Sequence, residues 1–207
     1  MTDGERVRSF LAIDLPEEVK AGLGRISESL KRRVGGVRWT KPEGIHLTLK
    51  FFGDISGEEI ARISIVAGSA AGVTAPFQLT VEGLGVFPGP KRPRVLWVGV
   101  GGRLDILARL QRGIDSALEA QGFEKEGRGF KPHLTLGRFR SPGEVSGIER
   151  VFAERNDYRA GGFTAEGLTL FKSDLTPKGA VYSALEFFPF KGKAEPAEIE
   201  TKNSPQG

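Results

Sequence analysis

The tetrapeptide His-Leu-Thr-Leu occurs twice, at residues 46–49 and 133–136, and it constrains this chain more than any other feature. The 207 residues contain 2 histidines, and each histidine opens one of the two copies. Leucine that alternates with histidine and threonine has the period of a half-buried β-strand. In each copy we therefore expect the leucines to face a core. The histidine and threonine would share the other face, about 7 Å apart.

The similarity extends beyond the tetrapeptides, which predicts an internal duplication. At the same offset of 87 residues, apolar positions match: Phe10 with Trp97, Ile13 with Val100, Val19 with Ile106, Leu23 with Leu110, and Phe52 with Phe139. We expect one bilobal domain over residues 1–191, with halves at roughly 7–90 and 91–190. Packing about a pseudo-two-fold axis would bring both histidine–threonine faces to a central groove. The alternative is a purely structural role, in which the tetrapeptides are two core strands with partly satisfied polar residues. A single copy would favour this alternative, but two copies do not.

The composition excludes several classes of protein. Without cysteine the chain has no disulfides, thiolate chemistry or cysteine-based zinc sites. No apolar run approaches a membrane span, and residues 1–8 lack a signal-peptide core, so we expect a cytoplasmic protein. The net charge of +4 is compatible with an anionic ligand.

The order of the expected elements favours the α+β class, with mostly antiparallel sheets and helices outside. Strands are expected at 7–15, 45–52, 77–87, 95–100, 163–171 and 181–187, and in the segment that His133 opens. Helices are expected after Pro16, after the capping-box pattern Ser56–Glu59, from Leu104, and after Ser141–Pro142. The polar segment 192–207 is predicted to be a disordered tail.

Two imidazoles that face each other can do three kinds of chemistry. A zinc site would need a third protein ligand, and the histidine faces of the two strands carry no acid. A nucleophilic triad is not indicated, because no Gly-x-Ser-x-Gly elbow occurs. Acid–base catalysis at one centre fits best, since histidine titrates near pH 6.5 and one ring can give a proton while the other takes one. That geometry suits in-line substitution at phosphorus.

Several segments resemble the two-histidine (2H) phosphoesterase superfamily. Besides the two tetrapeptides, they are Phe10–Asp14, Arg38–Trp39, Lys50–Gly53, Pro93–Trp97 and Phe130–His133. Within the superfamily the chain most resembles the bacterial and archaeal RNA 2′,3′-cyclic phosphodiesterases, once called 2′-5′ RNA ligases. The resemblance runs from about Val7 to Phe190 and implies a LigT-like fold.

The resemblance implies hydrolysis of RNA 2′,3′-cyclic phosphate ends to 2′-phosphomonoesters, with 2′-5′ ligation as a further activity in vitro. His46 would be the proton donor to the leaving 3′-oxygen, and His133 the proton acceptor from water. Thr48, Thr135 and Arg138 would bind the phosphate. Strict alternation places Arg138 on the leucine face, so this role requires a bulge or the end of the strand. No metal and no cofactor are implied.

Lys50 and Phe52 are predicted to extend the His46 face, and Phe139 the His133 face, as substrate contacts. A phenylalanine could stack on the terminal base, although simple packing is an equal interpretation. The alternatives are a phosphodiesterase for small cyclic nucleotides or 2′-5′ oligonucleotides, and a non-catalytic RNA-binding module. We expect a monomer, because the duplication already supplies both halves of the site.

Overall fold

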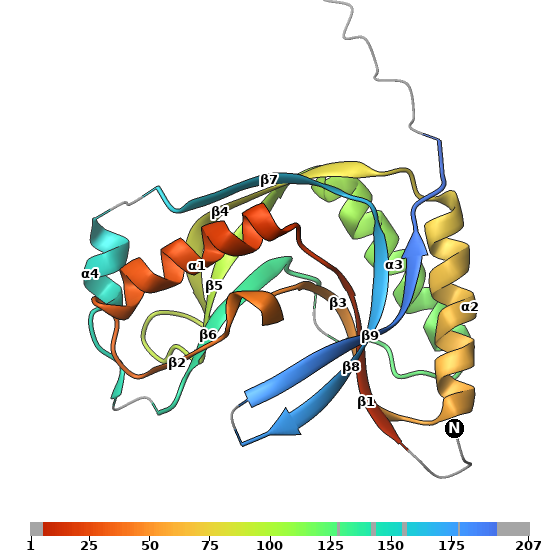
Figure 1. Ribbon diagram of the computed structural model, residues 1–207, viewed down its shortest axis with the longest axis horizontal. Coiled ribbons are helices and arrows are strands. Elements are labelled where there is room, and N and C mark those ends of the chain that lie inside the picture. The colour runs from red at the N-terminus through yellow and green to blue at the C-terminus, as the bar shows by residue number, and fades with distance from the viewer. Residues whose placement is uncertain (1–5, 128, 142–143, 155–156, 178, 194–207) are drawn as a thin grey trace, which may run out of the picture.

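The computed structural model describes residues 6–127, 129–141, 144–154, 157–177 and 179–193. Along the chain the elements are β1 (Val7–Ile13), α1 (Glu17–Lys31), β2 (Val37–Trp39), the short 3-10 helix η1 (Pro42–Gly44), β3 (Leu47–Ile55), α2 (Gly57–Val73), β4 (Phe77–Phe87), β5 (Val95–Gly102), α3 (Leu104–Ala120), β6 (His133–Phe139), α4 (Ile148–Ala153), β7 (Arg159–Ala165), β8 (Gly167–Thr176) and β9 (Gly179–Pro189) (Figure 1).

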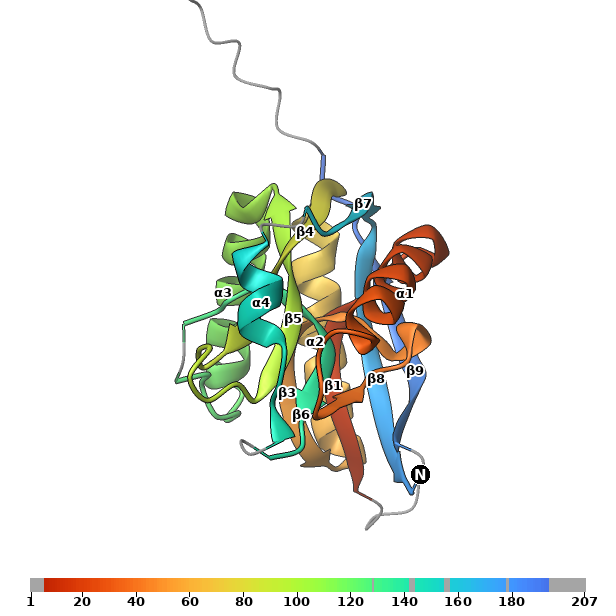
Figure 2. The same cartoon turned by 90° about the vertical axis from the view of Figure 1, so that its left-hand side faces the viewer.

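The strands form two antiparallel sheets, in the orders β3-β1-β8-β9 and β2-β6-β5-β4-β7. Helix α1 packs against β7, and α2 packs against β8, β9 and α3 (Figures 1 and 2). The predicted α+β class, with antiparallel sheets and helices outside, is confirmed.

Each sheet contains strands from both halves of the sequence. Strands β8 and β9 join β1 and β3, whereas β2 and β4 join β5 and β6. The neighbours β3 and β1 in one sheet correspond to the neighbours β6 and β5 in the other when the strands are matched by the predicted repeat. The chain therefore crosses between the sheets several times. One crossing, from β2 to β3, carries His46.

Burial follows the period that the tetrapeptides predict. Leu47, Leu49, Leu134 and Leu136 are at most 4% exposed. The histidines and threonines between them are partly exposed. The prediction that leucines face the core in both copies is confirmed. Within the described residues, no helix is long and apolar enough to cross a membrane.

The start of α2 follows the predicted capping box. The Glu59 N–H donates to Ser56 Oγ at 3.2 Å, and the Ser56 N–H donates to Glu59 Oε2 at 2.8 Å. The predicted helix start at Ser141–Pro142 lies partly outside the described residues, and the helix described in this segment, α4, begins at Ile148, so the expected Val145 is not part of it. Gly147 precedes it at φ +78°, a left-handed conformation that ends regular backbone before the helix can start.

Several expected boundaries also shift, and the strand expected at 163–171 is divided between β7 and β8 at Glu166. Two of the shifts concern the first histidine and the tail. The first histidine strand begins at Leu47 rather than Ile45, because the Ile45 N–H closes the η1 turn on the Pro42 carbonyl at 3.1 Å. His46 thus lies directly ahead of β3. Gly192, where the tail was predicted to begin, still donates to the Thr74 carbonyl at 2.9 Å. Residues 194–207 of the predicted tail lie outside the described residues.

Candidate active site

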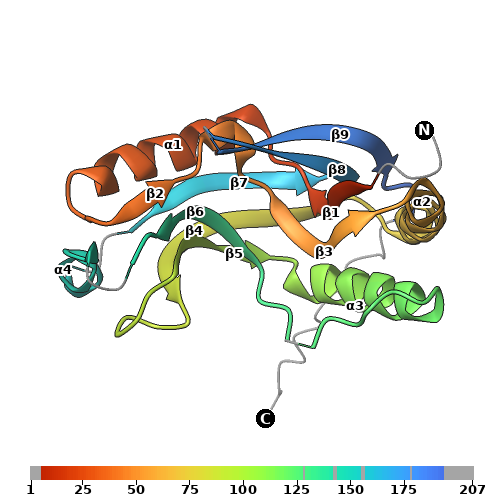
Figure 3. The same ribbon diagram turned by 90° about the horizontal axis from the view of Figure 1, so that it is seen from below.

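Both tetrapeptides lie where the two sheets meet. Strand β3 contacts β6, as Figures 2 and 3 show. The Thr40 N–H, in the segment that leads to His46, donates to the Leu136 carbonyl of β6 at 2.8 Å. The chain ahead of the first histidine is therefore bonded directly to the strand that His133 opens.

His46 is enclosed by aromatic rings. Phe10 stacks on it with ring centroids 4.3 Å apart, and Tyr182 meets it edge-on at 5.0 Å. Burial lowers the pKa of His46 to about 4, against the opposite effects of the Asp14 carboxylate and a hydrogen bond with the Gly44 backbone. At neutral pH this imidazole is therefore uncharged unless an anion binds beside it.

His133 is oriented by the backbone two residues before it. Its Nδ1 lies 2.7 Å from the Lys131 carbonyl oxygen, which can only accept, so Nδ1 carries the hydrogen. This leaves the lone pair of neutral His133 on Nε2. Burial lowers the pKa of His133, the hydrogen bond to Lys131 raises it, and the positive charge of Arg138 lowers it further.

A bulge in β6 turns Arg138 toward this histidine. The cross-strand partners are Gly99 for His133, Trp97 for Thr135 and Val95 for Arg138. These three partners alternate along β5 and share one face of the sheet, so His133, Thr135 and Arg138 share that face too. Leu136 is the extra residue of the bulge. The requirement stated for Arg138 is thus met, and its side chain is exposed.

Strand β3 has a bulge at the equivalent leucine, Leu49. Thr48 lies opposite Ala12 and Phe51 opposite Phe10, so Thr48 and Phe51 share the His46 face. Lys50 lies opposite Leu11 and points into the core. The prediction that Lys50 extends the His46 face is therefore wrong, because strict alternation does not survive the inserted residue.

The buried Lys50 ammonium has its own partners. Its Nζ lies 2.5 Å from Asp115 Oδ1 on α3 and donates to the Glu124 carbonyl at 2.7 Å. The Lys50 and Asp115 side chains are 5% and 10% exposed. This ion pair connects β3 to α3 and to the segment that leads to β6, and it leaves the ammonium unavailable to a ligand.

Phe52 and Phe139 also turn to the core face. Phe52 packs edge-on against Phe123 with centroids 5.8 Å apart. Phe139 lies opposite the buried Val37 and packs against the same core. The predictions that Phe52 and Phe139 extend the histidine faces are wrong, because each residue follows a bulge, and Phe52 is itself the extra residue of a second bulge in β3. Phe51, which the sequence reasoning missed, is 61% exposed on the His46 face.

The arrangement offers two proton-transfer groups, two hydroxyls and one guanidinium, with aromatic rings behind the imidazoles. Such a set can exchange protons at one centre while it binds the oxygens of a phosphate. Among the described residues, no group of three or more His, Cys, Asp or Glu side chains could hold a metal ion.

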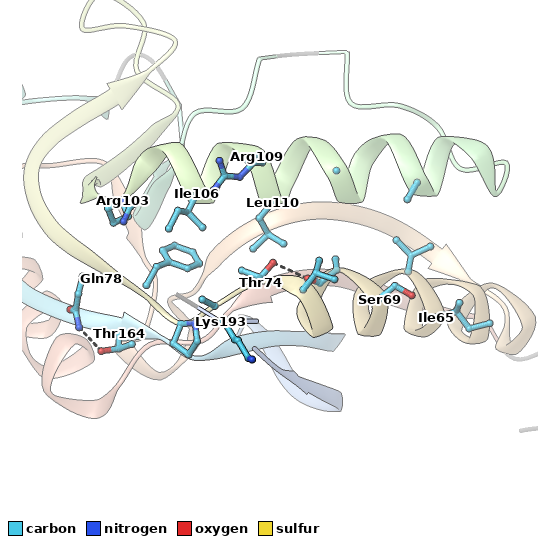
Figure 4. A pocket seen from close by; sticks show the side chains of 18 of the residues that line it. Ile65, Ser69, Thr74, Gln78, Arg103, Ile106, Arg109, Leu110, Thr164 and Lys193 are labelled. Carbon is cyan, nitrogen blue, oxygen red and sulfur yellow. Dashed lines mark hydrogen bonds between the residues drawn. The ribbon is translucent and has the colours of Figure 1, made fainter. Parts of the chain in front are cut away.

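A separate hollow of about 1010 Å³ lies between α2 and α3 (Figure 4). Ile65 and Ser69 of α2 line it together with Ile106 and Leu110 of α3. The residues that line it include neither histidine and neither threonine of the tetrapeptides. It is therefore not part of the candidate active site.

Comparison with known proteins identifies related chains. The family model described as LigT like Phosphoesterase matches residues 13–97 and 101–182. The RNA 2′,3′-cyclic phosphodiesterase of Methanothermobacter thermautotrophicus is 36% identical over 183 residues, which cover 88% of this chain and 98% of that protein. The protein of the same name from Thermotoga maritima is 33% identical over 186 residues, with coverages of 90% and 97%.

Solved structures agree with these relatives. A crystal structure of a protein from Thermus thermophilus matches with a TM-score of 0.75 and 31% identity, over 90% of this chain and 100% of the other. The crystal structure of E. coli LigT complexed with 3′-AMP matches with a TM-score of 0.71 and 25% identity, over 90% and 99% of the two chains.

Proposed function

This chain belongs to the LigT-like phosphoesterases, and we propose that it hydrolyses RNA 2′,3′-cyclic phosphate ends to 2′-phosphomonoesters. The two relatives bear the name RNA 2′,3′-cyclic phosphodiesterase, and the match with this chain covers nearly their whole length. A relative of known structure binds 3′-AMP, a nucleotide that carries its phosphate on the ribose. The substrate is thus an RNA end, and the reaction is a hydrolysis at phosphorus.

The observation that carries the mechanism is the charge beside each histidine. Asp14 favours a proton on His46, which suits the proton donor, whereas burial and the Lys20 ammonium disfavour that proton in the free protein. Arg138 disfavours a proton on His133, which suits the proton acceptor. His133 takes a proton from water, and the water oxygen attacks phosphorus. The bond from phosphorus to the 3′-oxygen breaks, and His46 protonates that oxygen. The phosphate remains on the 2′-oxygen, and no metal or cofactor takes part.

The phosphate oxygens are bound by Thr48, Thr135 and Arg138. Each threonine lies two residues after a histidine on the same face. An anionic phosphate between the rings also raises the pKa of His46 from its low value in the free protein, because opposite charge favours the protonated form. Binding of the substrate thus supplies the charged donor that the reaction needs.

Phe51 takes the role first assigned to Phe52 and Phe139, stacking on the terminal base. Its ring is exposed and lies on the His46 face, 5.7 Å from Phe10. Every base offers a π-face, so this contact gives affinity without selecting a base.

We also propose that the protein acts as a cytoplasmic monomer. One chain carries both histidines and both threonines of the site. In the alternatives, the substrate is a small cyclic nucleotide or a 2′-5′ oligonucleotide, or the chain binds RNA without turnover.

Product analysis of a ring-opened RNA dinucleotide tests the proposal. The expected product carries the phosphate on the 2′-hydroxyl; a 3′-phosphate would overturn the assignment of the leaving group. His46→Ala and His133→Ala should each lower turnover by about 10²- to 10⁴-fold while binding persists. Binding without turnover in the unmutated protein would favour the RNA-binding module instead.

A further inference from the structure

Arg38 lies directly opposite Arg138. Strand β2 forms the edge of its sheet beside β6 (Figures 1 and 3), and the register pairs these two arginines. Opposite residues of an antiparallel pair point to the same face, with Cβ atoms about 5 Å apart. Arg38 therefore extends the face that carries His133 and Thr135 by one strand.

Two like charges in this position destabilise a sheet unless an anion lies between or above them. Some arginines in this chain are paired with acids, as Arg33 is with Glu154 and Arg159 with Asp157. Within the described part of the chain, neither Arg38 nor Arg138 forms such an ion pair, and both side chains are exposed. The two guanidinium groups are thus available to an external polyanion.

The backbone holds this pair in place. A Cβ at Gly137 would come within 2.5 Å of Val37 Cγ1 and 2.9 Å of the Arg38 carbonyl oxygen, so only glycine lets β2 approach β6. The predicted repeat makes Lys50 of β3 equivalent to Gly137, and Lys50 is buried. Among the described residues, no strand equivalent to β2 pairs with β3 there. Among the described residues, a second arginine therefore lies beside the His133 strand and not beside the His46 strand.

We propose that Arg38 binds the phosphodiester on the 5′ side of the terminal nucleotide, while Arg138 binds the cyclic phosphate itself. This inference rests on the proposed function. A guanidinium donates two parallel hydrogen bonds to phosphate oxygens, and in RNA the next phosphate is one nucleotide away. The substrate class is then an oligonucleotide with at least two phosphates rather than a free cyclic nucleotide.

The test compares adenosine 2′,3′-cyclic phosphate with the dinucleotide ApA that ends in the same cyclic phosphate. The quantity measured is the ratio of kcat/KM for the dinucleotide to kcat/KM for the mononucleotide. The wild-type protein should prefer the dinucleotide, and Arg38→Gln should lower the ratio about tenfold. Arg38→Lys keeps the charge without the fork and should retain part of the preference.

The salt dependence gives a second measure. Loss of one phosphate contact should lower the slope of log kcat/KM against log salt by about 0.7 for the dinucleotide. The matched control is Arg112→Gln, since Arg112 is an exposed arginine on α3. It should leave both the ratio and the slope as in the wild type.

Two results would overturn the role of Arg38 alone. One is an unchanged ratio in Arg38→Gln, and the other is an equal loss for both compounds, which would place Arg38 on the cyclic phosphate beside Arg138. Failure of the wild-type protein to open either compound is a different outcome. It would overturn the proposed function, and the role of Arg38 with it.

Discussion

Replacing Lys50 with methionine should lower the free energy of unfolding by about 3–5 kcal/mol, the usual cost of removing one partner from a buried ion pair. Methionine keeps most of the apolar stem, so the loss is mainly electrostatic. Asp115 would keep a carboxylate whose side chain is 10% exposed, with the Glu126 N–H at 3.3 Å as a remaining partner. At an effective dielectric constant near 20, charges about 4 Å apart attract by about 4 kcal/mol, which agrees with this range.

The double variant Lys50→Met/Asp115→Leu removes both charges. It should unfold within about 1 kcal/mol of the wild type, because the desolvation cost of two buried ions disappears with their attraction. The coupling energy of the cycle should then exceed about 2 kcal/mol. Urea unfolding measures these values. In a thermal scan the single variant should melt about 10 °C lower, at roughly 2–4 °C per kcal/mol for a chain of this size.

The reasoning would be refuted if Lys50→Met cost less than about 1 kcal/mol, or if the double variant showed the sum of the single losses. The Lys50→Met variant also tests whether Lys50 lies in the core, away from the substrate. Well below its melting temperature, the folded Lys50→Met variant should retain the wild-type kcat/KM. A large loss of activity would mean that the ammonium reaches the substrate after all.

Four further predictions concern the site. Folded His46 stays neutral down to pH about 4, whereas the unfolded residue takes a proton near 6.5; stability should therefore fall by about 3 kcal/mol as pH drops through that window. A His46→Gln variant should lack this contribution in urea titrations at pH 7 and 4.5, and parallel curves would contradict it. Because burial lowers the pKa of both histidines, the free enzyme in which one of the two histidines is protonated becomes rare above pH 7. In that range kcat/KM should fall about tenfold per pH unit. A flat profile to pH 9 would exclude His46 and His133 as the acid–base pair. Phe51→Ala should raise KM about tenfold for a dinucleotide that ends in a 2′,3′-cyclic phosphate. Phe52→Ala, its matched control, should mainly lower the melting temperature. Equal KM values for the two variants would exclude stacking by Phe51. Saturating EDTA should leave turnover unchanged, and loss of activity that zinc restores would require a metal site.

The face that each site residue occupies depended on the bulges at Leu49 and Leu136. A period-2 pattern assumes that every residue of a strand has one partner, and on that assumption Lys50, Phe52 and Phe139 belonged with the histidines. The pairing with β1 and β5 inserts Leu49 and Leu136 as extra residues. Each insertion reverses the faces of the residues that follow it. Nothing local in His-Leu-Thr-Leu indicates this, because a bulge is a property of two strands in register.

The sequence by itself determined which residues could do chemistry and how the leucines beside them are buried. Two histidines in a doubled, alternating tetrapeptide, and the family resemblance around them, were sufficient for this, since burial and period are local properties of a strand. Only the tertiary structure decided that Phe51 and Arg138 join the histidine faces, that Lys50 is neutralised in the core, and that Arg38 lies opposite Arg138. These are consequences of partner strands and of the crossing from β2 to β3, which involve residues far apart in the chain.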